Sequence, residues 1–287
     1  MAKMEPFMFM AALISFGVSV VFYFWYVVKM RRLGRLGIVA RGEDAPGEFL
    51  ILWEPGRFAT MMAVLGMVFL TLSMTFRTVV TGHGPFTNMY EYSQAWSWGI
   101  VASLLYFQRS YRLKALGVLV TPVAVGFLLY AYNLPSRALP LVPALQQSLL
   151  LTIHVAVAMI AYGTFATGFA AAILYLFQRR GRVGWLPSPD LLDDLGYRAV
   201  AVGFLFMTLT IVLGALWADI AWGRYWGWDP KETASLATWI LYSGYLHARL
   251  VTGWRGVRSN ILLIVGFAGV LFTYFGNYFL GGLHSYV

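Results

Sequence analysis

LLLTIHVAVAMIAYGTFATGFAAAILYLF, residues 149–177, is the stretch of the chain that decides its fold. It contains no Asp, Glu, Lys or Arg, and His154 is its only histidine. A helix needs about 20 apolar residues to cross the hydrocarbon core of a bilayer, which is about 30 Å thick. The stretch is long enough, so it predicts a transmembrane helix.

The whole chain has the composition of an integral membrane protein. Of its 287 residues, 60% are hydrophobic and only 11% are charged, and the mean hydropathy is +0.69. Soluble domains carry about 25% charged residues. The chain has no cysteine, which excludes disulfides, thiolate metal sites and thiol chemistry of its own. Four histidines remain as the good ligands for a soft metal, besides twelve methionines.

Seven further stretches are apolar and long enough to cross a bilayer. The eight predicted spans are about 6–28, 59–80, 89–107, 115–132, 149–177, 199–217, 233–250 and 259–280. The predicted fold is therefore all-α, a polytopic membrane protein with about eight transmembrane helices. Before the sixth span, Ser188 and Pro189 predict the N-cap and first residue of a short helix that leads into it.

Lysine and arginine set the expected orientation, because cytoplasmic connections carry an excess of them. The first, third, fifth and seventh connections hold 16 of the 21. This predicts that both termini are extracytoplasmic. The net charge of +9 is then a topology signal, and no nucleic-acid partner is expected. We divide the chain into a first span with a basic cytoplasmic loop, residues 1–58, and a membrane core, residues 59–287.

Three of the four histidines fall on the outer side in this topology. His83 lies in an outer loop, His154 near the outer end of the fifth span, and His284 in the tail after the last span. His247 is different, since it lies roughly 27 Å down the seventh helix from Asp229 at 1.5 Å per residue. An ionisable group inside a span is a functional hypothesis by default, although a role in helix packing is an alternative.

The loop 217–232 between the sixth and seventh spans is the other unusual feature. Its segment WGRYWGWDPKE, residues 222–232, follows shortly after another indole. The four tryptophans are Trp217, Trp222, Trp226 and Trp228. Tryptophans also anchor proteins at membrane interfaces, which would explain one or two of them. Four within twelve residues, separated by glycines, favour a flat ligand instead.

The end of this segment has a structural explanation. Asp229 suits an N-cap, Pro230 the first helical position, and Glu232 the reciprocal contact of a capping box. The aromatic part calls for a large, flat, apolar ligand with an anionic edge for Arg224 or Lys231. A metal held by two neutral imidazoles completes the requirement. Haem meets all of these demands, whereas a quinone meets only the flatness.

The segment closely resembles the W-G-x-x-W-x-W-D-P-K-E signature of haem-handling proteins in cytochrome c maturation. Other motifs are similar to the CcsA (ResC) branch of the second maturation system: GHGPFTNMYE at 82–91, IHVAVAMIAYGTF at 153–165, YLHAR at 245–249 and GLHSY at 282–286. The similarity runs from about residue 60 to the end. Eight spans also suit this branch better than the shorter CcmC or the much longer CcmF.

The resemblance implies roles for individual residues. His154 and His284 would be the axial ligands of haem b at the outer site and the catalytic pair, and His247 a ligand on a transmembrane route. The four tryptophans, Arg224, Asp229 and Lys231 would contact the haem. His83 would only support the outer loop.

The resemblance also implies partners and a place in the cell. A CcsB (ResB)-like membrane protein would supply the second intramembrane histidine, because this chain has no other deep one. Apocytochrome c would receive the haem through its CxxCH segment, and a thiol-reducing protein would keep that segment reduced. The expected location is a bacterial plasma membrane, with a haem lyase site on the extracytoplasmic side.

Three alternatives remain open at this level. The chain could export or chaperone haem without attaching it. It could be a di-haem electron-transfer protein, although that would usually need more than one deep histidine. It could handle quinones or lipids, in which case the outer histidines would have no role.

Overall fold

A computed structural model describes residues 3–35, 54–111, 113–137, 145, 148–179, 183 and 186–284. These parts contain helices and no strand. The eight α-helices are α1 (Glu5–Arg35), α2 (Pro55–Thr81), α3 (Met89–Tyr111), α4 (Gly117–Tyr132), α5 (Ser148–Gln178), α6 (Pro189–Trp222), α7 (Pro230–Leu250) and α8 (Val257–Leu280), with a 3-10 turn at Lys114–Leu116. The predicted all-α fold is confirmed. Most of the loop within the predicted unit 1–58 lies outside the described residues.

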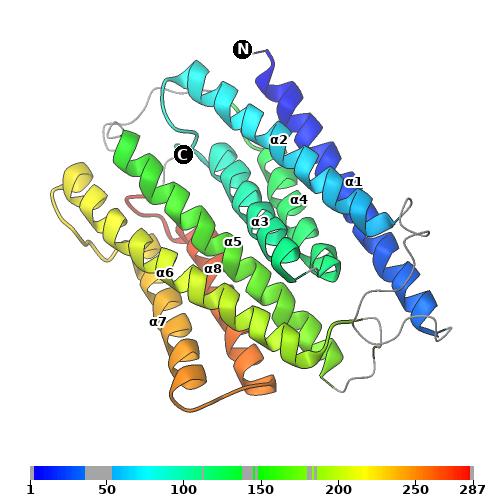
Figure 1. The fold of residues 1–287 in the computed structure, drawn as a ribbon. Helices are drawn as coiled ribbons and strands as arrows, with labels where there is room; N and C mark the ends of the chain where they lie inside the picture. Colours follow the sequence, from blue (N-terminus) through cyan, green and yellow to red (C-terminus); the bar gives the residue numbers. More distant parts are fainter. Residues whose placement is uncertain are drawn as a thin grey trace.

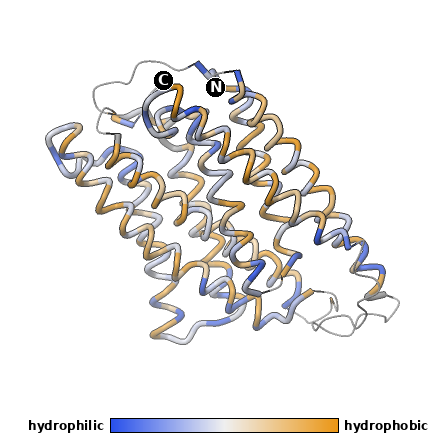
Figure 2. The backbone as a smooth tube through the Cα atoms, turned by 45° about the horizontal axis from the view of Figure 1, so that its top comes forward, coloured by the Kyte–Doolittle hydropathy of each residue, from blue (hydrophilic) through white to orange (hydrophobic). Residues whose placement is uncertain are grey.

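The helices run up and down in one bundle (Figure 1). α1 begins and α8 ends at the same end of the bundle, and the α2–α3 and α6–α7 turns lie there too. We call this the outer end, following the predicted orientation. Hydrophilic residues gather near the helix ends, and apolar residues fill most of the length between them (Figure 2).

Six of the eight helices have the length and apolar composition of a membrane span. The exceptions are α3 and α7, although 89–107 and 233–250 were predicted as spans. α3 buries many polar residues, including Glu91, Gln94 and Gln108. It needs less apolar surface than a helix in contact with lipid, because it is enclosed by its neighbours.

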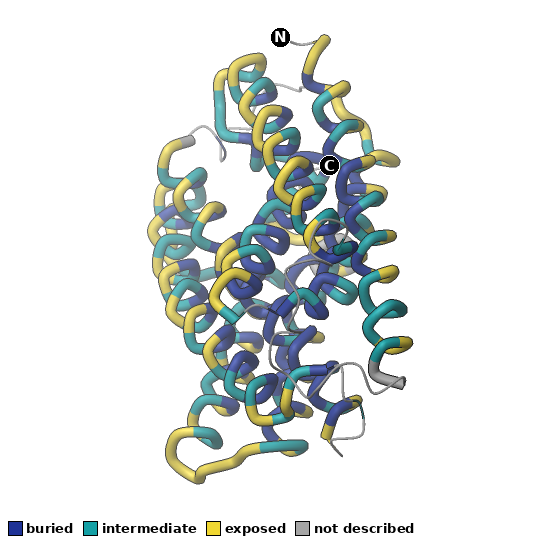
Figure 3. Tube along the Cα trace, turned by 45° about the vertical axis from the view of Figure 1, so that its right-hand side comes forward, coloured by how far each residue is buried: buried dark blue, intermediate teal, exposed yellow. Residues whose placement is uncertain are grey.

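α5 lies at the centre of the bundle and contacts α3, α6 and α8. Its crossing with α3 is close enough to require glycine on both sides. A Cβ on Gly163 would stand 2.1 Å from the carbonyl oxygen of Gly99, and a Cβ on Gly99 would stand 2.5 Å from that of Met159. Buried residues line the middle of the bundle and exposed ones cover its outward faces (Figure 3).

The start of α6 corrects one prediction. Ser188 is the N-cap, accepting from the N–H of Leu191, and Pro189 opens the helix, as predicted. The prediction of a short separate helix was wrong, since α6 continues without a break to Trp222. Nothing in LLDDLGYRAV breaks a helix strongly enough, and its one glycine, Gly196, is buried close to Leu263 of α8.

Candidate functional site

His154 lies two turns into α5 at the outer end, against α6. Its Nδ1 lies 3.0 Å from the carbonyl oxygen of Thr210. A carbonyl can only accept, so Nδ1 carries the proton and Nε2 keeps its lone pair. The ring lies directly on Gly214, where a Cβ would stand 2.8 Å from Cε1 of the imidazole. α6 therefore fixes both the position and the tautomer of this histidine.

His284 reaches the same region from the C-terminal tail. Gly281, with a φ of 67°, turns the chain at the end of α8. Asp229 then holds the tail at two points: its Oδ1 lies 2.8 Å from Nδ1 of His284, and its Oδ2 accepts from the N–H of Leu283 at 2.6 Å. Nδ1 of His284 donates to the carboxylate, so Nε2 is again the nitrogen with a free lone pair.

The electrostatics of this pair keep the carboxylate ionised and the imidazole neutral. Burial opposes ionisation of Asp229, but the hydrogen bond from His284 and the N–H groups of Lys231 and Leu283 lower its pKa to about 2. Burial lowers the pKa of His284, against the effect of its hydrogen bond to Asp229, and the charge of Lys231 lowers it further. A neutral imidazole can bind a metal through Nε2.

The segment Asp229–Glu232 forms the predicted capping box at the start of α7. Asp229 accepts from the N–H of Lys231, and Glu232 Oε2 accepts from the N–H groups of Asp229 and Gly227. The helix-start prediction is confirmed. The sequence did not reveal that the capping carboxylate also holds His284.

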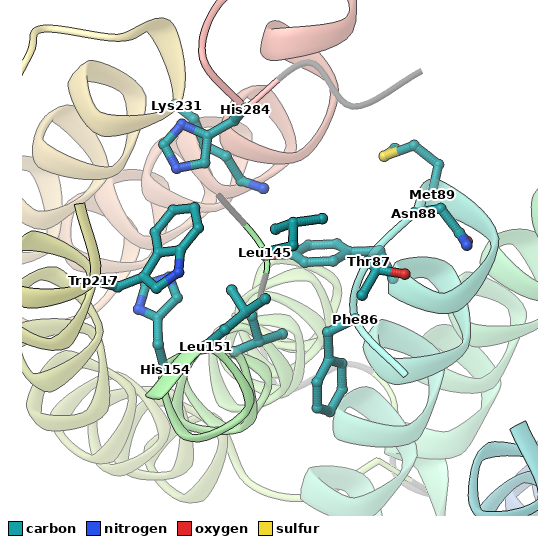
Figure 4. Close-up of a pocket in the computed structure, with 12 residues that line it drawn as sticks. Phe86, Thr87, Asn88, Met89, Leu145, Leu151, His154, Trp217, Lys231 and His284 are labelled. Atoms are coloured by element: carbon teal, nitrogen blue, oxygen red, sulfur yellow. The ribbon is translucent and has the colours of Figure 1, made fainter. Parts of the chain in front are cut away.

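Two adjoining hollows meet at these histidines. Both are bordered by Tyr92, His154, Lys231 and His284. The first continues toward Trp217 and the loop 86–89, and the second toward Gly214, Trp226 and Glu232. In Figure 4 the indole of Trp217 lies between the two imidazoles.

Each hollow has a volume of about 50 Å³. That is enough for a water molecule or two and too little for a porphyrin. A porphyrin can therefore bind between the histidines only if the rings that lie there, Trp217 above all, move aside.

Among the residues that the structure describes, Lys231 is the one cation that borders both hollows. Its Nζ lies 4.3 Å from the centre of the Tyr92 ring. This cation–π contact holds the ammonium group beside the two histidines. An anionic edge of a ligand would meet it there.

The four tryptophans do not form one surface. Trp217 is almost fully buried, and its ring centre lies 4.8 Å from that of Trp222. The ring of His284 lies 5.8 Å from Trp217 and 4.9 Å from Trp222. Trp226 borders the second hollow. Trp228 is 69% exposed and borders neither hollow.

Arg224 also lies outside both hollows and is exposed. His83 is apart from them as well, with its Nδ1 2.9 Å from the carbonyl oxygen of Gly84. The predicted site residues that meet are therefore His154, His284, Lys231 and the first three tryptophans, with Asp229 behind His284.

His247 occupies a different environment, in the last turn of α7 at the inner end. Its side chain is exposed on the surface of the bundle, and no side-chain hydrogen bond joins it to any residue in the described ranges. Two residues on, Arg249 is buried and pairs with Asp193 of α6. Asn260 of α8 donates to the same carboxylate.

Three residues of the site were not singled out from the sequence: Tyr92, Thr210 and Gly214. Thr210, Gly214 and Trp217 follow one another at helical spacing, so a signal existed. It identifies one face of α6 and not the neighbour that this face contacts.

The comparison with known proteins gives the family. The family described as Cytochrome C assembly protein matches residues 86–284. The chain belongs to this family. The matched range includes His154, His284 and the tryptophan-rich loop.

Several relatives carry the name "Cytochrome c biogenesis protein CcsA". The one from Guillardia theta is 36% identical over 251 residues, covering 78% of this chain and 83% of the relative. The one from Chlamydomonas reinhardtii is 40% identical over 238 residues, covering 79% and 67%. The one from Parasynechococcus marenigrum is 35% identical over 260 residues, covering 79% and 85%. The chain is thus a multi-pass membrane protein of the CcsA family with a role in cytochrome c maturation.

Proposed function

We propose that the chain presents haem b, its substrate, at the outer face of a bacterial plasma membrane and takes part in attaching it to the CxxCH segment of apocytochrome c. The observation that carries the proposal is the pair of outer imidazoles. His154 and His284 border the same hollows, and each donates Nδ1–H to an acceptor of its own chain. Metal-binding histidines almost always make such a contact with their other nitrogen.

The surroundings of the histidines suit haem. Trp217, Trp222 and Trp226 offer indole rings to a flat macrocycle, and Lys231 offers a cation to a propionate. Trp222 borders neither hollow, but its ring lies 4.9 Å from that of His284. Arg224 and Trp228 also lie outside the hollows, and we assign them no part in this contact. The bound ring would take the space between the imidazoles that Trp217 fills in Figure 4.

The proposed contribution of the chain to the reaction is to hold the haem vinyl groups and the thiols in position. In thioether formation each thiol adds its sulfur and its hydrogen across one vinyl double bond, so no redox equivalent is consumed. Holding reacting groups in place can contribute up to about 7–11 kcal/mol to such a step. The histidine of the CxxCH segment would replace one of the two imidazoles and so bring its thiols beside the vinyl groups. We assign the replaced imidazole to His284, since it sits on a tail held by Asp229 while His154 is fixed in α5.

Two partners follow from what the chain lacks. His247 is exposed on α7 and would form an inner haem site with a histidine of a CcsB-like protein. The sequence has no cysteine, so a separate thiol-reducing protein would keep the CxxCH segment reduced.

The test is reconstitution of the purified chain with its CcsB-like partner, reduced haem and a CxxCH peptide. We expect covalent haem on the peptide, measured by mass spectrometry, and none with a peptide whose cysteines are serines. Haem that binds to the complex and is never attached would favour export or chaperoning, and no haem binding at all would refute the proposal.

A further inference from the structure

The turn between α6 and α7 exposes three large side chains at the outer end of the bundle. Tyr225 is 58% exposed and Trp228 is 69% exposed, and Arg224 beside them is exposed as well. The two histidines and the other three tryptophans do not share this exposure. These three side chains therefore form a second, exposed feature, which meets the second hollow at Tyr225.

The residues around Trp228 impose a strained backbone conformation that leaves its side chain exposed. Its φ is 56°, in the left-handed region that bulky residues rarely adopt, and among the described residues no other non-glycine shares a positive φ. Glu232 Oε2 accepts from the N–H groups on both sides of it, Gly227 at 2.8 Å and Asp229 at 3.1 Å. Strain of this kind persists only where neighbours impose it, and it is concentrated at functional positions.

Arg224 is also held in place. A Cβ on Gly227 would stand 2.8 Å from Nε and 2.9 Å from Cζ of Arg224, so the guanidinium lies directly on the backbone of the turn. One turn thus presents a cation at Arg224 and an exposed indole at Trp228. Together they can bind a carboxylate or carbonyl and an apolar side chain.

We propose that Arg224, Tyr225 and Trp228 form a docking ledge for the unfolded polypeptide that receives the haem. The inference rests on the proposed function. The ledge is continuous with the site, because Tyr225 also borders the second hollow, where His154 and His284 meet. A polypeptide lying on the ledge would have its next residues at the opening of that hollow.

Membrane anchoring is the competing explanation of an exposed indole. Anchoring requires only that the ring lies at the depth of the interface, and an unstrained loop can do that. Trp, Tyr and Arg are side chains that an interface also favours, so it is the imposed φ of Trp228 that argues for docking. A fixed direction and hydrogen-bond donors suit a polypeptide.

The test measures binding of a labelled unfolded peptide to the haem-loaded complex. The peptide carries SxxSH in place of CxxCH, so that binding is not followed by attachment. Trp228→Asn is the central variant, because asparagine tolerates the left-handed conformation and removes only the ring. The control is Trp25→Ala, which removes an indole that is 54% exposed on α1.

We expect Trp228→Asn to weaken peptide binding about tenfold, with an unchanged haem spectrum and an unchanged melting temperature. Arg224→Gln should weaken it less, and Trp25→Ala should leave it unchanged. Equal peptide affinity in Trp228→Asn and the wild type would overturn the proposal. So would loss of bound haem in Trp228→Asn, or a loss of binding to lipid vesicles without a change in peptide affinity. If the wild type bound the peptide and no haem, the proposed function would fail while the ledge remained.

Discussion

The outer and inner histidines of this chain differ in how completely the chain surrounds them. At the outer end, His154 and His284 come from α5 and the tail, and each has its Nδ1 fixed by an acceptor. At the inner end, His247 stands exposed on α7 with no such contact among the described residues. Histidines whose other ring nitrogen donates to a fixed acceptor are typical of metal sites.

At the inner end, the polar contacts join the helices to one another and do not involve His247 in the described structure. Asp193, Arg249 and Asn260 form a buried cluster that joins α6, α7 and α8. It fixes the helix that carries His247 and leaves the imidazole itself free. We propose from this difference that the outer site is complete within the chain and that an inner site would need a partner.

Removing an outer ligand should have the largest effect. We expect His154→Ala and His284→Ala each to reduce covalent haem attachment by about 100-fold or more, since even the contacts behind a metal ligand are worth about 10–100-fold. Mass spectrometry of the peptide measures this. Added imidazole should restore part of the activity, and His83→Ala should behave as the wild type, because His83 lies outside the hollows.

Asp229→Asn should weaken haem binding about 10–100-fold. The amide keeps an acceptor for Nδ1 of His284 but loses the charge that orients the imidazole. The measurement is a haem titration of the purified chain. An affinity equal to that of the wild type would show that the carboxylate serves only the capping box.

The carboxylate of Asp229 also predicts that the folded chain loses stability in acid. The pKa of Asp229 is lowered from 3.8 to about 2 in the folded chain. A depressed pKa contributes stability above the unfolded value and loses it as pH falls through the folded one. Stability should therefore decline between about pH 4 and pH 2. In Asp229→Asn this part of the decline should be absent from thermal unfolding curves.

Gly214→Ala should have a smaller, more specific effect. Its Cβ would stand 2.8 Å from Cε1 of His154, so the imidazole must shift. Overpacking of this kind costs at least about 1 kcal/mol, which would lower the haem affinity about fivefold. Gly126→Ala is the matched control, because nothing lies within 4 Å of its Cβ. Equal affinities of the two variants would mean that the contact with α6 does not set the ligand geometry.

His247→Ala should have the smallest effect on the isolated chain. An exposed side chain away from special features contributes within about 0.5 kcal/mol to stability. Thermal unfolding in detergent should not distinguish this variant from the wild type. In the complex with the CcsB-like partner, the same change should reduce the haem content, and a lowered melting temperature of the chain alone would contradict the comparison.

Local features were predictable from the sequence. The capping box at Asp229 and the N-cap at Ser188 follow from short motifs, and both are confirmed. All eight predicted spans coincide with helices, and six of these helices have the length and apolar composition of a membrane span. The polar character of α3 was not anticipated, because burial among other helices allows a sequence that lipid would not.

The arrangement of the site depended on contacts between distant residues. His284 and Asp229 are 55 residues apart, and His154 and Thr210 are 56 apart. The four tryptophans looked like one surface, yet they form two pairs, Trp217 with Trp222 and Trp226 with Trp228. The turn at Trp228, whose φ is 56°, leaves that indole exposed. Neither the pairing nor the turn is encoded in a local pattern.

We propose that this chain alone completes an outer haem site. The most direct measurement is the absorption spectrum of the purified chain, without partner, titrated with reduced haem. We predict the spectrum of a low-spin, bis-imidazole haem at one haem per chain, retained in His247→Ala and lost in both His154→Ala and His284→Ala. A spectrum lost in His247→Ala, or retained in both outer variants, would contradict the account.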